Sequence, residues 1–160
     1  PRQSLRYLGD LGHVMHKAIA VIGPHDAAEQ QQAAAYAVGR LLALQGIDVF
    51  TGGLGGVMAA ASKGAAEAGG LTIGILPGSD PSEANPYVRV PIATGMGEAR
   101  NLILVRSADA VIAIGKGYGT LSEIAFTLRL GKRVVLLDSW EVEGGLKVSW
   151  PHEAVAQALG

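Results

Sequence analysis

The stretch "DAVIAIGKGYGTLSEIAF" (109–126) joins a continuous apolar run to a glycine-rich turn and then to a segment of helix-forming residues. An apolar run without alternation is typical of a strand that is covered on both faces. A strand that leads through a short turn into a helix is the repeating unit of α/β proteins with a parallel sheet. This stretch therefore predicts one strand–turn–helix unit of such a sheet.

Five further runs repeat the pattern along the chain. They are "AIAVIG" (18–23), "IDVFTG" (47–52), "LTIGIL" (71–76), "YVRVPIA" (87–93) and "RVVLLD" (133–138). The run over 87–93 is the weakest strand pattern, because it alternates and contains Pro91. The six runs predict an α/β, Rossmann-like fold with a mostly parallel sheet of about six strands and helices on both faces.

Helix-forming segments separate these runs. The segment 26–46 begins with Asp26, a candidate cap, and ends at Gly46, a residue type that commonly terminates helices. Further helices are expected over 55–70, 97–108, 119–131 and 152–160. We find no repeat, linker or domain break, so a single domain over 1–160 is expected, with 1–17 as an N-terminal arm.

Composition limits the classes of function. A chain of 160 residues with 49% hydrophobic residues can bury a core of its own. The net charge of −1 provides no electrostatic footprint for a nucleic-acid backbone. No apolar stretch approaches the ~20 residues that span a bilayer, and "PRQSLRYLGDLGHVMHKAIAV" (1–21) has no small-residue cleavage pattern. With no cysteine in the chain, we expect a cytoplasmic protein without nucleic-acid or membrane partners.

Three glycine-bearing turns follow predicted strands: "TGGLGG" (51–56), "TGMGEARN" (94–101) and "GKGYGT" (115–120). In a parallel sheet they meet at the carboxyl edge, where ligands bind near the point at which strand order reverses. Helix N-termini there offer free amides and partial positive charge, which suit a phosphate. Glycine in these turns lets the backbone approach the phosphate closely. The alternative is that these glycines only make tight turns, since G-x-G-x-x-G after the first strand and the P-loop motif are both missing.

Glu123 and Arg100 are candidate catalytic residues at the same edge. A carboxylate ~5 Å from a bound phosphate charge is repelled by ~3 kcal/mol at an effective dielectric of 20, so an acid there needs a cation or a chemical task. Arg100, in the first turns of another helix, can supply that cation. The alternatives are that Glu123 closes a capping box with Thr120, and that Arg100 pairs on the surface with Glu98 or Glu67.

Other polar residues near these turns are weaker candidates. Lys116 is either a second phosphate cation or an exposed loop lysine, and His25 is a candidate for ligand contact after the first strand. His13 and His16 are three residues apart but lack further metal ligands. No metal site and no cofactor are expected.

The segments "GGLGGVMAAASKGA", "GMGEARN" and "GKGYGTLSE" together resemble the Lonely-Guy family, long labelled possible lysine decarboxylases, whose hallmark is P-G-G-x-G-T-x-x-E. The likeness spans about 18–138. It implies a Rossmann-like sheet, a homodimer or larger assembly such as a tetramer, and a site for a nucleoside 5′-monophosphate. Enzymes of the family cleave the N-glycosidic bond, and their key arginine and glutamate fall on Arg100 and Glu123. The resemblance places the phosphate loop on Gly117, Gly119 and Thr120, and the earlier glycine loop on Gly52, Gly53, Gly55 and Gly56.

Two departures separate this chain from the hallmark. Gly115-Lys116-Gly117 stands in place of Pro-Gly-Gly, and Asn101 stands where the enzymes have lysine. These features resemble a sister branch that includes the molybdenum-cofactor carrier proteins, which hold a phosphate-bearing pterin without converting it. The preferred hypothesis is therefore binding of a phosphorylated nucleotide-like or pterin molecule. The alternative is a nucleoside 5′-monophosphate phosphoribohydrolase, and lysine decarboxylation is disfavoured because it requires a Schiff-base lysine.

Overall fold

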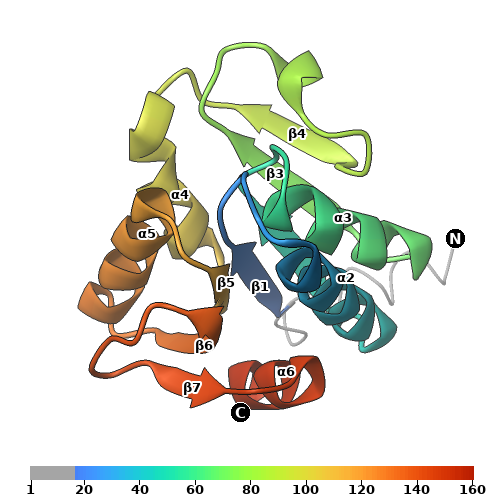
Figure 1. Cartoon of the computed structure of the whole chain (residues 1–160). Helices are drawn as coiled ribbons and strands as arrows, with labels where there is room; N and C mark the ends of the chain where they lie inside the picture. The colour runs from blue at the N-terminus through green and yellow to red at the C-terminus, as the bar shows by residue number, and fades with distance from the viewer. Residues whose placement is uncertain (1–16) are drawn as a thin grey trace, which may run out of the picture.

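The computed structural model describes residues 17–160 and contains one sheet of seven parallel strands in the order β4-β3-β2-β1-β5-β6-β7 (Figure 1). The elements are β1 (Ala18–Ile22), α2 (Glu29–Leu44), β2 (Asp48–Thr51), α3 (Val57–Glu67), β3 (Thr72–Leu76), η1 (Pro81–Glu83), β4 (Val90–Ala93), η2 (Gly97–Ala99), α4 (Arg100–Ser107), β5 (Ala110–Gly115), α5 (Tyr118–Arg129), β6 (Arg133–Ser139), β7 (Leu146–Val148) and α6 (Pro151–Leu159). The predicted α/β, Rossmann-like fold is confirmed.

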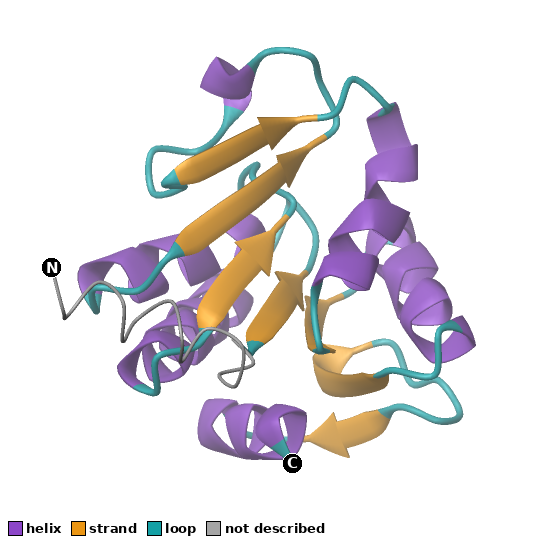
Figure 2. Ribbon diagram, turned by 180° about the vertical axis from the view of Figure 1, so that it is seen from behind, coloured by secondary structure: helices purple, strands orange, loops and turns teal. Residues whose placement is uncertain are grey.

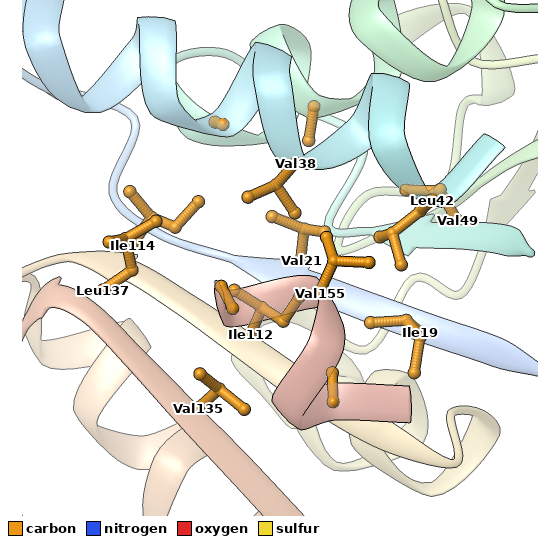
Figure 3. Packing of buried hydrophobic residues seen from close by; sticks show 14 of the residues in the cluster. Ile19, Val21, Val38, Leu42, Val49, Ile112, Ile114, Val135, Leu137 and Val155 are labelled. Carbon is orange, nitrogen blue, oxygen red and sulfur yellow. The ribbon is translucent and has the colours of Figure 1, made fainter. Parts of the chain in front are cut away.

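Helices cover both faces of the sheet, and each face has its own buried cluster. One face packs on α2, α3 and α6, through residues such as Val38, Ala61 and Val155. Figure 3 shows Val38 and Val155 in this cluster. The other face packs on α4 and α5, through residues such as Leu104 and Ile124. Figure 2 shows the strands running in one direction between these layers. The central strands are buried on both faces, which explains their continuous apolar sequences.

Two glycines let α2 and α3 cross in close contact. A Cβ atom on Gly39 would lie 2.0 Å from the carbonyl oxygen of Ala61, and one on Gly64 would lie 2.0 Å from the carbonyl oxygen of Tyr36. No side chain fits at either position without moving the helices apart. The two glycines therefore set how closely α2 and α3 pack.

The edges of the sheet and one helix start differ from the sequence expectations. β4 is an exposed edge strand, the position in a sheet where proline is tolerated. β7 was not predicted, because its three residues are mostly exposed and carry no apolar run. Asp26 is not the cap of α2, since the helix begins at Glu29 and the Gln31 side chain accepts a hydrogen bond from the Ala28 amide at the cap.

Some expectations concern residues that lie outside the described range. His13, His16 and nearly all of the expected N-terminal arm belong to residues 1–16. Among residues 17–160, no helix has the length and apolar character needed to cross a bilayer.

Candidate functional site

A pocket opens where the strand order reverses. From β1 the chain moves through β2 and β3 to the β4 edge, then returns to β5 on the other side of β1. Loops that leave β1 and β5 in opposite directions create a crevice at their carboxyl ends. The pocket there has a volume of about 260 Å³ and is lined by Gly23, Pro24, His25, Met58, Arg100, Asn101, Gly117, Gly119, Thr120 and Glu123. We call it the switch-point pocket.

The N-terminus of α5 forms one wall of this pocket. Gly117 is the cap residue, the helix begins at Tyr118, and the first cap hydrogen bond runs from the Leu121 amide to the Gly117 carbonyl. The first amides of a helix have no partner within it. Gly119 and Thr120 therefore bring a helix N-terminus to the pocket wall.

Glu123 does not cap this helix. The cap makes no side-chain hydrogen bond, and Glu123 lies in the second turn, where it is 6% exposed and lines the pocket. The capping-box alternative is therefore wrong: Thr120 lies inside the first turn, too late to serve as the cap.

Arg100 reaches the pocket from the start of α4 and is half-buried. Its Nη1 donates a hydrogen bond to Asn101 Oδ1, and its Nη2 makes a long contact of 3.5 Å with the Gly52 carbonyl. Its Nε is buried and has no hydrogen-bond partner. Pairing with Glu67 is wrong, because Glu67 accepts a hydrogen bond from the Tyr36 hydroxyl instead. The guanidinium is thus held in place with donor capacity left over.

Asn101 connects Arg100 to the α5 wall and was not selected from the sequence as a site residue. The side chain is 4% exposed, and its Nδ2 donates to Ser122 Oγ at 3.3 Å. Ser122 Oγ donates to the Gly119 carbonyl at 2.7 Å. A chain of hydrogen bonds therefore links the guanidinium on α4 to the first turn of α5. The only sequence feature that pointed to a special role for Asn101 was that the family's enzymes have lysine at this position.

Burial raises the pKa of Glu123 to about 8, although the nearby Arg100 charge acts in the opposite direction. Burial also lowers the pKa of Arg100, while Glu123 and Glu98 raise it. A carboxyl group with a pKa of about 8 carries its proton at pH 7. The repulsion expected between Glu123 and a phosphate is then removed largely by protonation, and the arginine need not offset it alone.

The glycine turn 51–56 does not line the pocket and instead packs against two residues that do, Arg100 and His25. A Cβ atom on Gly52 would lie 2.8 Å from Arg100 Nη2, and one on Gly55 would lie 2.4 Å from His25 Cε1. Gly56 has φ +62, and a Cβ there would lie 2.2 Å from the His25 carbonyl oxygen. Gly53 packs beside Leu76. This turn supports Arg100 and His25, which do line the pocket.

Lys116 lies outside the switch-point pocket. It is exposed and lines a separate hollow with Glu141 and Lys147. The hydrogen bond and the charge of Lys147 lower the pKa of Glu141, and the charge of Lys116 adds a smaller effect in the same direction. Gly23, Pro24 and Met58 line the switch-point pocket but were not predicted. Gly23 and Pro24 follow β1 at the carboxyl edge, directly before His25, which was a candidate for ligand contact.

Within the described part of the chain, no three His, Cys, Asp or Glu residues are grouped to hold a metal ion.

Known proteins resemble this chain over most of its length. The structure of the molybdenum cofactor binding protein from Rippkaea orientalis matches with a TM-score of 0.85 and 39% identity, over 89% of this chain and 95% of that chain. An uncharacterized protein of Archaeoglobus fulgidus is 48% identical over 138 residues, which are 86% of this chain and 91% of that protein.

A plant enzyme resembles the chain over a shorter stretch. The cytokinin riboside 5′-monophosphate phosphoribohydrolase LOG of Oryza sativa is 40% identical over 97 residues, which are 58% of this chain but only 40% of the enzyme. These matches confirm the resemblance to the Lonely-Guy superfamily and to proteins that bind the molybdenum cofactor. The model of the SLOG cluster4 family matches residues 16–157, and the chain therefore belongs to the SLOG cluster4 family.

Proposed function

We propose that the protein binds a phosphate-bearing pterin of the molybdenum-cofactor type in the switch-point pocket. The observation that carries the proposal is the convergence of Arg100 with the N-terminus of α5 in one pocket at the carboxyl edge of the sheet. The similarity to the Rippkaea orientalis protein over nearly the whole chain supports the same ligand class.

Each wall has a distinct task in this proposal. Backbone amides at Gly119 and Thr120 hold the phosphate, since a helix N-terminus favours an anion. Arg100 adds a full positive charge and the spare donors of its guanidinium. The protonated Glu123 carboxyl donates a hydrogen bond to a ligand oxygen, which an ionised carboxylate cannot do.

An arginine variant tests the assignment by calorimetric titration with a phosphate-bearing pterin. An arginine hydrogen-bonded to a charged group contributes about 1.5–3 kcal/mol, so Arg100→Ala should weaken binding about 10- to 150-fold. Arg106→Ala is the matched control, because Arg106 is exposed on the same helix. Equal affinities of the two variants would refute the placement of the phosphate beside Arg100.

A phosphoribohydrolase is the second candidate function, favoured by the pKa of Glu123. A carboxyl that titrates near pH 8 beside an arginine suits general acid–base work on an N-glycosidic bond. Incubation with AMP, GMP and CMP, followed by chromatography for free base, tests it. Base release that Glu123→Gln abolishes would support the enzyme, and tight binding without release would support the binding protein.

Lysine decarboxylation and assembly are tested separately. None of the five lysines lines the switch-point pocket, so we expect no lysine-dependent formation of cadaverine. A homo-oligomer and a cytoplasmic location remain predictions, and light scattering of the purified protein measures the first of them.

A further inference from the structure

A second hollow lies at the carboxyl end of β6, between the first turns of α2 and the start of α6. Its volume is about 450 Å³, and its lining includes the small side chains of Ala33 and Ala34 together with Asp138 and Trp150. We call it the Trp150 pocket. It shares no residue with the switch-point pocket, and the proposed function makes no use of it. A hollow of this size is large enough for a small organic ligand.

Asp138 carries an unusual backbone at the wall of the Trp150 pocket. Among residues 17–160 it is the only non-glycine with a positive φ, at 48°. Its Oδ2 accepts a hydrogen bond of 3.1 Å from Gln31 Nε2, and Gln31 Oε1 is held in turn by the Ala28 amide. A residue whose backbone is held in a sparsely populated region, and whose side chain is held by a neighbour, is a feature that clusters at ligand sites.

Trp150 provides an open aromatic surface on the same pocket. It stands directly before α6 and is 61% exposed, although it is among the largest apolar side chains of the protein. An aromatic ring is stabilised by a stacked or edge-to-face partner beyond the area that it buries. The described residues give Trp150 no aromatic partner, whereas Trp140 stacks on Tyr118. A flat ligand would supply that partner.

The two features together define the ligand chemistry. An ionised carboxylate only accepts hydrogen bonds, and its two oxygens match two parallel N–H donors. One carboxylate among the described lining residues is too few to hold a divalent cation of the usual coordination number. The neighbouring Gln30 amide can both donate and accept at the edge of a ring.

We propose that the Trp150 pocket is a second small-molecule site, which binds a planar heterocycle by stacking on Trp150 and by paired N–H donation to Asp138. The ring has adjacent amino and ring N–H groups, the pattern of an aminopyrimidinone such as guanine. The ligand of this pocket needs no phosphate, so the proposal does not rest on the function assigned to the switch-point pocket.

Calorimetric titration with guanosine, inosine and adenosine tests the proposal. Guanosine carries both donors, inosine lacks the amino group, and adenosine lacks the N–H pair. We expect guanosine to bind at least about tenfold more tightly than adenosine, with inosine between them. Equal binding of the three nucleosides, or no guanosine binding at millimolar concentration, would overturn the proposal.

Two variants locate the site. Asp138→Gly removes the carboxylate and relieves the positive φ, so the protein should fold while guanosine binding falls at least about tenfold. Trp150→Ala should weaken all three nucleosides, and Arg100→Ala should leave guanosine binding unchanged. Guanosine binding that is lost with Arg100→Ala but kept with Asp138→Gly would overturn the proposal. Light scattering that shows Trp150→Ala dissociating into smaller assemblies would also overturn the proposal, because a second copy of the protein would then be what covers the Trp150 pocket.

Discussion

Replacing Glu123 with glutamine should make the folded protein more stable at alkaline pH. In the folded state the pKa of Glu123 is raised from 4.5 to about 8, because burial disfavours the carboxylate. Between these two values the folded protein holds a proton that the unfolded chain has released. The free energy of unfolding of the wild type therefore falls as pH rises from about 4.5 to about 8. Glutamine mimics the protonated acid and does not titrate.

The size of the effect follows from the same two pKa values. Each pKa unit corresponds to about 1.4 kcal/mol, so the interval from 4.5 to about 8 amounts to about 4–5 kcal/mol at most. Near pH 5 the variant should lead by less than about 1 kcal/mol, because that pH is only just above the unfolded-state pKa of 4.5. Near pH 6.5 the variant should lead by about 2–3 kcal/mol, and above pH 8 the difference should level off.

Urea unfolding at pH 5, 6.5, 8 and 9 measures this difference, with the variant and wild type compared at each pH. Glu143→Gln is the matched control, because Glu143 is exposed and should follow the wild type at every pH. Parallel stability profiles of Glu123→Gln and the wild type would refute the reasoning. They would mean that Glu123 ionises in the folded protein as easily as in the unfolded chain.

Three further predictions concern binding and packing. Above pH 8, ionisation of Glu123 places a negative charge in the switch-point pocket. The affinity for a phosphate-bearing ligand, measured by calorimetric titration, should then fall by up to about tenfold per pH unit. Glu123→Gln should abolish this fall. Gly64→Ala forces α2 and α3 apart, so it should lower the free energy of unfolding measured in urea by about 1–3 kcal/mol. Ala66→Ser, at an exposed position of the same helix, is the control and should change that free energy little. Lys132 Nζ donates three hydrogen bonds at the end of α4, to the carbonyls of Val105, Arg106 and Ala108. Lys132→Met removes these bonds, so it should lower the melting temperature clearly more than Lys116→Met, a change of an exposed lysine.

The order of strands and helices was largely readable from local patterns. The run 109–115 became a strand buried on both faces, and Gly46, with φ +73, stands just after the end of α2. Such features depend on a few consecutive residues, because side-chain burial repeats along a strand and a left-handed backbone favours glycine. β7 escaped prediction because its pairing with β6, and not its composition, makes it a strand.

The candidate site was predicted only in part. Arg100 and Glu123 do meet with Gly117, Gly119 and Thr120, as parallel-sheet geometry required. Lys116, next to Gly117 in the chain, faces a different hollow, and the glycines of 51–56 support the pocket from behind. A turn can send neighbouring side chains in opposite directions, which the sequence does not specify.

By itself, the sequence determined the layers of this protein and the edge of the sheet at which its turns gather, since both follow from local hydrophobicity and from the geometry of parallel strands. Only the tertiary structure decided which side chains from those turns share a pocket, how the Asn101 amide links Arg100 to α5, and that Glu123 keeps its proton at neutral pH. Each of these depends on contact and burial between segments far apart in the chain.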